Sequence, residues 1–195
     1  MIIGITGGSG CGKTTALNVI RDMGGLILDC DAIYHQLLKT DTQMLAAIEA
    51  RFPGTVEKGT LDRKKLGAIV FADENALLDL NAITHGAVKK EVLRQLESNP
   101  KLAAIDAIGL FEGGLAELCD VTVAIIAPEK DRIARLMTRD GISEEYAKSR
   151  IAAQHTDDWF RAACDHVLEN NGKLDAFATK CVAFFKSLSI MEENP

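Results

Sequence analysis

The sequence is short of positive charge and has no long hydrophobic run. It contains 22 lysines and arginines against 28 aspartates and glutamates, a formal net charge of −6. Because sequence-independent affinity for nucleic acids and membrane surfaces rests on positive charge, neither is an expected partner. No apolar run approaches the length of a membrane-spanning helix. Positive charge is therefore expected to be concentrated at one site and not spread over the surface.

The sequence also lacks a cysteine pairing pattern and an amino-terminal signal. Its five cysteines are widely spaced and include no C-x-x-C pair, which argues against a disulfide framework and a zinc site. The first residues do not show the basic and then apolar pattern of a secretory signal. We therefore expect reduced thiols and a cytoplasmic location. A length of 195 residues and a hydrophobic content of 47% predict one domain with a substantial core.

What the chain does have is a phosphate-binding motif at its start. Gly7, four further residues, Gly12, Lys13 and Thr14 follow the P-loop spacing G-x-x-x-x-G-K-[ST]. An apolar, β-branched run at 2–5 precedes the glycines, and apolar residues at helical spacing follow them. The pattern predicts a strand, a glycine loop and a helix, in that order.

This loop suits the phosphates of a nucleoside triphosphate. Backbone N–H groups of a glycine-rich turn surround a phosphate where no side chain blocks the approach, and a helix N-terminus adds its dipole. Lys13 supplies a charge for the β- and γ-phosphates, and the Thr14 hydroxyl is placed for Mg²⁺. A dinucleotide-binding G-x-G-x-x-G loop is excluded, because Lys13 and Thr15 stand where its last glycine would be needed. The expected nucleotide-binding residues of the loop are Gly8, Ser9, Gly10, Cys11, Gly12, Lys13, Thr14 and Thr15.

Carboxylates follow the second and third predicted strands. Asp29 and Asp31 come after the apolar residues 26–28, and Asp106 comes after the next apolar run. Parallel sheets place their chemistry beyond the carboxyl ends of the strands. Asp31 is the candidate to accept a proton from the attacking hydroxyl or to orient it, with Asp29 as partner or Mg²⁺ ligand. Asp106 is a candidate Walker B carboxylate near Mg²⁺. The alternative is that Asp29 or Asp31 only caps the helix predicted from Ala32.

Residues 32–98 show helical patterns and few strand signals, which is more than a crossover between two strands needs. We interpret this stretch as an inserted region that holds the acceptor substrate. Its candidate polar residues are Arg63, Asn81 and His85, and for His85 a structural role is an equal alternative. Glu112 is a second carboxylate candidate for the neighbourhood of Asp106.

The positive charge gathers late in the chain. Arg132, Arg135 and Arg139 stand at i, i+3 and i+7, on one face of a predicted helix. Gly141 ends that helix, and Ser143 begins the next as its N-cap. Two short helices hinged at a glycine and carrying arginines predict a lid that closes over phosphates. The alternative is a solvated helix with i,i+4 ion pairs.

The uniformly apolar run 121–127 predicts a fourth strand, and a short fifth strand is predicted at 167–168. The turn after it is expected near the base of the nucleotide, with Asn171 and Gly172 as nucleotide-binding residues. A closing helix then packs on the sheet. The core is expected at 1–31, 99–130 and 157–195, the acceptor-binding region at 32–98 and the lid at 131–156.

Further motifs follow the P-loop along the chain. They are Gly4-Ile5-Thr6-Gly7-Gly8 leading into the P-loop, Asp29-Cys30-Asp31, Gly59-Thr60-Leu61-Asp62-Arg63, Val70-Phe71, Leu80-Asn81 before His85, Leu110-Phe111-Glu112-Gly113, Arg135 with Arg139-Asp140-Gly141, Ala153-Gln154, and Ala163-Cys164-Asp165-His166-Val167 before Asn170-Asn171-Gly172. With these segments in this order, the sequence resembles the dephospho-coenzyme A kinase family through most of its length. It departs from the family's usual pattern at Gly86 (proline), at Ile108-Gly109-Leu110 (Pro-Leu-Leu) and at Arg132 (glutamine).

The resemblance implies transfer of the ATP γ-phosphoryl group to the 3′-hydroxyl of dephospho-coenzyme A, the last step of coenzyme A synthesis. It also implies an α/β P-loop fold, with a five-stranded parallel sheet flanked by helices, a helical acceptor-binding insertion and a helical lid. By the same likeness Asp31 would be the base, and Arg135 or Arg139 would hold the triphosphate. The residues that would serve the acceptor side are Arg63, Asn81, His85 and Glu112.

Two alternatives to this function stay open at the level of the sequence. One is a kinase for another nucleoside, nucleotide or sugar hydroxyl. The other is a P-loop switch or regulatory NTPase whose output is a contact with a partner. A monomer or a weak homo-oligomer is expected in each case.

Overall fold

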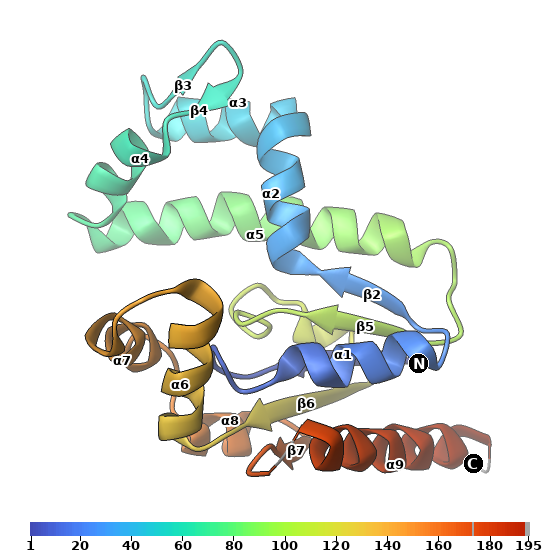
Figure 1. The fold of residues 1–195 in the computed structure, drawn as a ribbon. Helices are drawn as coiled ribbons and strands as arrows, with labels where there is room; N and C mark the ends of the chain where they lie inside the picture. The colour runs from blue at the N-terminus through green and yellow to red at the C-terminus, as the bar shows by residue number, and fades with distance from the viewer. Residues whose placement is uncertain (173, 194–195) are drawn as a thin grey trace. The chain divides into compact units, whose positions relative to one another are not determined.

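The short apolar strands of the sequence form one sheet. The computed structural model describes residues 1–172 and 174–193. In these residues the strand order is β2-β5-β1-β6-β7, with β1 at the centre (Figure 1). The β1–β5, β1–β6 and β6–β7 pairs are parallel, and the predicted five-stranded parallel sheet is confirmed. The strands are β1 (Ile2–Thr6), β2 (Leu26–Asp29), β5 (Ala103–Asp106), β6 (Val121–Ile126) and β7 (His166–Glu169).

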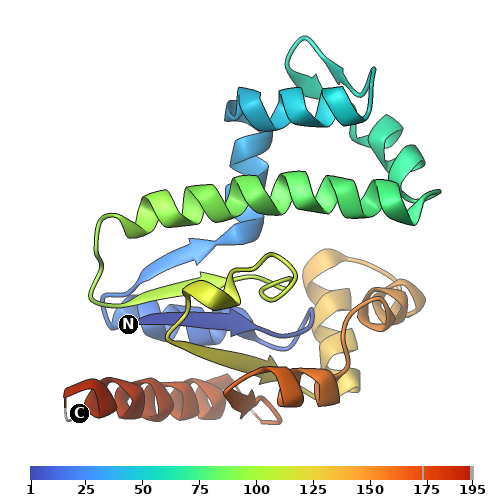
Figure 2. The same cartoon turned by 180° about the vertical axis from the view of Figure 1, so that it is seen from behind.

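Strand β6 shows why a buried parallel strand reads as a continuous apolar run. Val123 and Ile125 belong to the core that the sheet forms with helices α1 and α9. Ala124 and Ile126 instead contact Phe160 of helix α8. Since successive side chains of a strand point to opposite faces, helices on both faces favour apolar residues at successive positions, and only Thr122 of β6 is polar. Figure 2 shows the same sheet and helices from behind. These helices are α1 (Lys13–Asp22), α8 (Asp157–Ala163) and α9 (Leu174–Glu193).

The predicted lid consists of α6 (Glu129–Asp140) and α7 (Glu144–Ala152). Gly141 ends α6 in a left-handed conformation, with φ of 66°. The Ser143 hydroxyl oxygen accepts a hydrogen bond from the Tyr146 N–H at 3.2 Å and so caps α7. The predicted break and the predicted cap are both confirmed.

The chain divides into two compact units. The first, here called the sheet unit, is formed by Met1–Ile27, Pro100–Leu110 and Leu118–Pro195; the second, the helical unit, is formed by Leu28–Asn99 and Phe111–Glu117. Four helices of the helical unit, α2 to α5, each have an aspartate N-cap, whose side chain accepts a hydrogen bond from an N–H group of the first turn. These caps satisfy backbone donors that would otherwise have no intrahelical partner. The helices and their caps are α2 (Cys30–Thr40, Asp29), α3 (Thr42–Arg51, Asp41), α4 (Arg63–Val70, Asp62) and α5 (Glu74–Leu96, Asp73).

The helical unit also contains a small antiparallel hairpin that the sequence did not predict. It pairs β3 (Val56–Glu57) with β4 (Thr60–Leu61) around a turn in which Lys58 and Gly59 have φ of 50° and 76°. Strands of two residues leave too short a pattern for period-2 alternation to be visible. A 3₁₀ turn at Ala116–Leu118 precedes β6.

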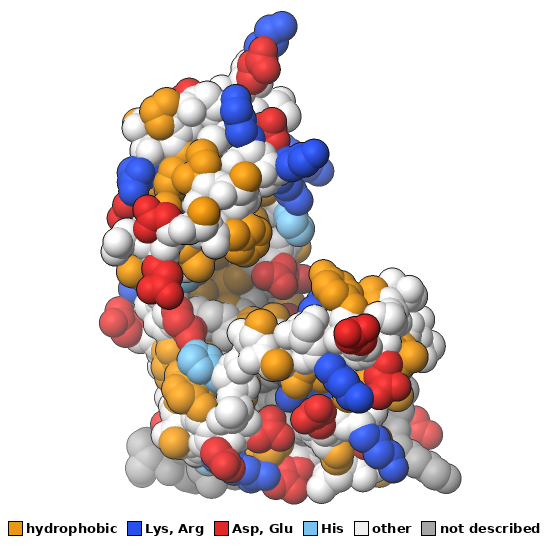
Figure 3. Space-filling model, turned by 90° about the vertical axis from the view of Figure 1, so that its left-hand side faces the viewer, with side chains coloured by type: hydrophobic (Ala, Val, Ile, Leu, Met, Phe, Trp, Pro, Cys, Tyr) orange, Lys and Arg blue, Asp and Glu red, His pale blue; other side chains and the backbone are white. Residues whose placement is uncertain are grey.

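Hydrophobic side chains gather on the face of the helical unit shown in Figure 3, with lysines and arginines around them. Among the exposed large hydrophobic side chains of this unit, Phe71 and Leu78 are 87% and 64% exposed. Among the described residues, no helix combines the length and the apolarity that crossing a membrane requires.

Candidate active site

The P-loop motif forms the turn between β1 and α1, as predicted. Gly7, Gly10 and Gly12 have φ of 131°, 77° and 105°, a region that favours glycine. At Gly7 space is restricted as well, because an added Cβ would lie 2.1 Å from the carbonyl oxygen of Ile125 on β6. The loop is therefore held against the neighbouring strand by a contact that only glycine allows.

Helix α1 begins with an N-terminus that is open to an anion. Its N-cap is Gly12, which contributes no side-chain cap, so the first N–H groups of α1 are directed out of the helix. Lys13 Nζ donates to the carbonyl oxygen of Gly7 at 2.9 Å, which places the ammonium group across the loop. The next residue, Thr14, is exposed. The motif thus brings together amide donors, one cation and one hydroxyl.

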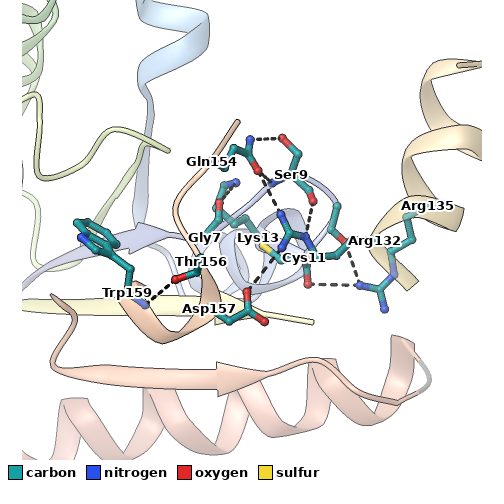
Figure 4. Close-up of polar contacts among 11 residues, drawn as sticks. Gly7, Ser9, Cys11, Lys13, Arg132, Arg135, Gln154, Thr156, Asp157 and Trp159 are labelled. Atoms are coloured by element: carbon teal, nitrogen blue, oxygen red, sulfur yellow. Dashed lines mark hydrogen bonds and ion pairs between the residues drawn. The ribbon is translucent and has the colours of Figure 1, made fainter. Parts of the chain in front are cut away.

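Two of the three arginines predicted on one helix face contact the P-loop (Figure 4). Arg135 Nη1 donates to the carbonyl oxygens of Gly10 at 3.0 Å and Cys11 at 3.4 Å. Arg132 Nε donates to the carbonyl oxygen of Ser9 at 3.0 Å. The guanidinium groups therefore hold the main chain of the loop from the side of α6.

Arg139, the third arginine of the row, has a different environment. Its Nε lies 2.7 Å from Asp140 Oδ1, and Arg150 Nη1 lies 2.6 Å from Asp140 Oδ2. Hydrogen bonds from Arg139 and Arg150, with the charges of both, lower the pKa of Asp140 to about 2. The side chain of Arg139 is 62% exposed beside Gly141. Its role at the triphosphate stays a prediction. The exposed ion pair of Arg139 is closer to the alternative of a solvated helix than are the contacts that Arg132 and Arg135 make with the P-loop.

Gln154, just after α7, contacts Ser9 of the P-loop, which the sequence did not predict. Its Oε1 accepts from the Ser9 N–H at 2.9 Å, and its Nε2 donates to Ser9 Oγ at 2.8 Å. The pair Ala153-Gln154 was visible as a motif. No local pattern could assign its partner, however, because Ser9 lies 145 residues earlier in the chain.

After β7, the residue that contacts the P-loop is Asn170. Asn170 Nδ2 donates to the carbonyl oxygen of Cys11 at 2.8 Å, and the residue is 3% exposed. The predicted ATP-binding residue Asn171 is exposed and donates to Glu169 Oε2 at 3.1 Å. Asn171 lines a pocket of about 210 Å³, whose other lining residues are Ile126, Ala127, Pro128, Asp157, Arg161 and Glu169.

The pKa of the Cys11 thiol depends on the charges around the P-loop. Burial raises the pKa of the Cys11 thiol, while Lys13 and Arg132 oppose that rise and the Asp106 carboxylate adds to it. Asp106 ends β5 and pairs in register with Ile5 of β1, directly before the P-loop. The structure therefore places the predicted Walker B carboxylate within electrostatic reach of the loop.

The predicted acceptor-side residues belong to the helical unit. Asp29 Oδ1 accepts from the Ala32 N–H at 2.9 Å, so Asp29 caps α2 as the alternative interpretation held. Asp31 lies in the first turn of α2 and is exposed. Arg63 opens α4, and its Nη2 lies 3.3 Å from His35 Nδ1.

Tyr34 and His35 are further residues that the sequence did not single out. Asp31, Tyr34 and His35 stand at i, i+3 and i+4, on one side of α2. Burial raises the pKa of Tyr34, and the charge of Arg63 opposes that rise. The structure therefore brings Arg63 to the α2 side that carries Asp31.

Asn81, His85 and Glu112 are the remaining acceptor-side candidates. Asn81 and His85 are half-buried on α5 at i and i+4, and Glu112 is exposed in the loop after β5. Their substrate contacts stay predictions.

Comparison with known proteins identifies the family. The dephospho-CoA kinase family profile matches residues 1–176. The chain belongs to the dephospho-CoA kinase family. A dephospho-CoA kinase of Anaeromyxobacter dehalogenans is 40% identical over 185 residues, which cover 92% of this chain and 88% of that protein.

Solved structures agree with this membership. Dephospho-CoA kinase from Campylobacter jejuni superposes with a TM-score of 0.69 at 26% identity, over 98% of each chain. TT1252 from Thermus thermophilus superposes with a TM-score of 0.80 at 32% identity, over 96% of this chain and 97% of that one. The protein is thus a kinase whose family transfers phosphate from ATP to dephospho-CoA and so forms CoA. The membership favours neither another acceptor nor a regulatory switch.

Proposed function

We propose that this chain phosphorylates the 3′-hydroxyl of dephospho-CoA by binding ATP at the P-loop of the sheet unit and the acceptor on the helical unit. One observation carries the ATP side: the open N-terminus of α1 lies under the Lys13 ammonium, in a glycine loop held by two arginines. Phosphoryl transfer needs mostly positioning and charge stabilisation, and these groups supply both.

Lys13 and the loop amides bind the β- and γ-phosphates. The ammonium now donates to the Gly7 carbonyl oxygen, a neutral partner, so a phosphate oxygen offers it a stronger charge-assisted bond. Arg135, adjacent to Gly10 and Cys11, offsets charge that spreads over the transferring group. Arg139 would add to this from the same helix after release from Asp140.

The chemistry of the donors fits Mg²⁺. Among the described residues, no group of three or more His, Cys, Asp or Glu side chains forms a closed metal cage. Mg²⁺ at ATP sites commonly takes one or two protein oxygens and completes its shell with phosphates and water. Thr14 at the start of α1 and Asp106 at the end of β5 would hold it. Asp29, the third residue predicted for the metal, caps α2 in the helical unit. When bound, the ion neutralises charge on the phosphates.

The pocket beside Asn171 is suited to the base of ATP. It lies next to Asn170, whose side chain contacts the P-loop, and Pro128 and Asn171 belong to its lining. Asn171 and Gly172 would line the base there. Asn170 positions the loop itself.

On the acceptor side, Asp31 orients the attacking hydroxyl and receives its proton. Its neighbour His35 contacts Arg63, so the α2 side that carries the carboxylate also meets a cation for the acceptor's phosphate groups. Asn81, His85 and Glu112 complete the candidate set. In this assignment Arg63 binds charge and Asp31 handles the proton.

We further propose a cytoplasmic monomer or weak homo-oligomer. The proposal is supported by the acidic net charge and by five cysteines without a disulfide. Size-exclusion chromatography with light scattering at several concentrations would measure the oligomeric state.

The experiment for the function is an acceptor screen. Purified protein with Mg²⁺ and ATP is given dephospho-CoA, adenosine, AMP or a sugar, and ADP release is followed while mass spectrometry identifies the product. The proposal expects ADP release that depends on dephospho-CoA and forms CoA. ADP release that is equal with and without acceptor would contradict it.

A further inference from the structure

Arg132 is a buried cation whose guanidinium contacts two segments of the sheet unit, the P-loop and the stretch from Gln154 to Asp157. Its Nε donates to the Ser9 carbonyl oxygen at 3.0 Å, and its Nη2 donates to Gln154 Oε1 at 3.2 Å. Its Nη1 lies 3.6 Å from Asp157 Oδ1. With 4% of the residue exposed, this charge is kept from solvent by the loop and by the chain that joins α7 to α8.

The P-loop is shaped to receive Arg132. A Cβ on Gly8 would lie 2.1 Å from Arg132 Nη2, and a Cβ on Gly10 would lie 2.8 Å from the Arg132 carbonyl oxygen. Gly8 has no positive φ, so its backbone conformation is open to other residues. Gly8 and Gly10 therefore leave the space that Arg132 occupies against the loop.

Ser9 is held at every polar group by this arrangement. Its carbonyl oxygen accepts from Arg132, and its N–H and hydroxyl both bond to the amide of Gln154. Gln154 Oε1 is shared, since it accepts from Arg132 and from the Ser9 N–H. Loss of Gln154 would leave Arg132 Nη2 without this acceptor, and loss of Arg132 would leave the Ser9 carbonyl oxygen without its donor, in a part-buried place. Figure 4 shows the guanidinium among Ser9, Gln154 and Asp157.

We propose that Arg132 and Gln154 act together as a clamp on Ser9, which positions the P-loop for ATP and ties the loop to the α7–α8 connection. Arg132 is in this account a positioning residue. It acts through Ser9, and its guanidinium presents a separate nitrogen to each of the three acceptors, whereas an ammonium carries all its donors on one nitrogen. The proposal rests on the P-loop being the ATP site.

Loss of the clamp should change KM for ATP and not kcat. A loop held in its binding conformation stabilises bound ATP and the transition state alike, so its loss raises KM for ATP and leaves kcat nearly unchanged. One lost charge-assisted hydrogen bond corresponds to about a tenfold change in affinity. We expect R132M and Q154A each to raise KM for ATP and the Kd of ADP by about tenfold.

The experiment compares R132M, R132K, Q154A and R132M/Q154A with the wild type. R21M is the matched control, because Arg21 is an exposed arginine of α1 whose guanidinium contacts Asn18 on the same helix. Calorimetric ADP binding, KM and kcat for ATP, and thermal unfolding are measured for each. The wild type must first release ADP with dephospho-CoA; failure there contradicts the proposed function and not the clamp.

The results separate the alternatives. If the clamp operates, the Kd of ADP for R132K should be close to that for R132M. The double variant should bind ADP about as well as the weaker-binding single variant, because both changes remove the same arrangement. Unchanged ADP binding in R132M and Q154A, a fall in kcat alone, or full restoration by R132K would overturn it. If R132M fails to fold, the Q154A variant decides, because Gln154 is only half-buried and this variant still contains Arg132.

Discussion

Thr122 and Asp165 lock strand β6 to the start of β7 by a reciprocal pair of bonds. Thr122 Oγ1 lies 2.7 Å from Asp165 Oδ2, and the Asp165 N–H donates to Thr122 Oγ1 at 3.0 Å. The Thr122 N–H adds a third bond to Asp165 Oδ2 at 2.8 Å. This explains the segment Ala163-Cys164-Asp165-His166-Val167 as structural, since it positions the strand that leads to Asn170.

The first prediction concerns the stability of this lock against pH. Hydrogen bonds from Thr122 lower the pKa of Asp165. A carboxyl with a lowered folded-state pKa contributes stability that is present above its unfolded pKa, about 4, and is lost as pH falls through the folded value. Because Asp165 is exposed and water screens its charge, we expect T122V to lower the free energy of unfolding by about 0.5–1 kcal/mol at pH 7, and by less below pH 4. Urea unfolding at both pH values measures this; an equal loss at both would contradict the role of the carboxylate.

The second prediction concerns Lys13. K13A removes the ammonium that lies over the P-loop, so turnover with ATP and dephospho-CoA is expected to fall by about 100-fold or more. Its bond to Gly7 is local, so the unfolding temperature should hardly change. ADP-release kinetics and thermal unfolding test the two statements separately. Normal turnover in K13A would remove the assignment of Lys13.

The third prediction concerns Asp31. D31N keeps the size of the side chain and removes its basicity, so kcat is expected to fall by about 100-fold or more while the affinity for ATP stays within about twofold. Steady-state kinetics with both substrates and calorimetric ADP binding provide the two values. Should D31N turn over normally, Asp31 is not the base.

The fourth prediction compares two glycines outside the site. Gly86 lies inside α5 with open space around its Cβ position, whereas Gly24 has φ of 86° after α1. G86A is expected to stabilise the fold by about 0.5–1 kcal/mol, because alanine has the higher helix propensity. G24A is expected to destabilise it by about 1 kcal/mol, because alanine is strained at positive φ. Chemical denaturation of both variants tests the pair; stabilisation by G24A would show that its φ is not restrictive.

The fifth prediction follows from the contact between Gly8 and Arg132. The Cβ of G8A would displace the guanidinium, so G8A should weaken ADP binding, and the loss should be smaller in an R132M background. Calorimetry on the two single variants and the double variant measures the coupling. Fully additive losses would show that the Gly8 methyl acts on the nucleotide directly.

The sequence predicted well wherever a local pattern carries the physics. The P-loop spacing predicted a strand, a loop and a helix at their observed places, and Gly141 with Ser143 predicted the break between α6 and α7. In both cases the deciding property, a positive φ or a cap, belongs to single residues. The five strands were found for a similar reason, as apolar runs before polar turns.

Long-range pairing is what the sequence could not provide. Arg132, Arg135 and Arg139 share a helix face, yet Arg132 is buried against Ser9 while Arg139 pairs with Asp140. Periodicity places residues on a face but does not say what lies opposite. The same limit hid the partner of Gln154. Asn170 was likewise less prominent than its exposed neighbour Asn171 as a site residue.

The central position of β1 has a consequence for how the protein moves. This strand is bonded on both sides, to β5 and to β6, and the P-loop continues directly from its carboxyl end. Edge segments and hinges can fray on their own, but a central strand exchanges its amide protons only when most of the sheet separates. We therefore expect the P-loop to be anchored in a slow-opening region of the sheet, with the motions of a catalytic cycle left to the segments around it.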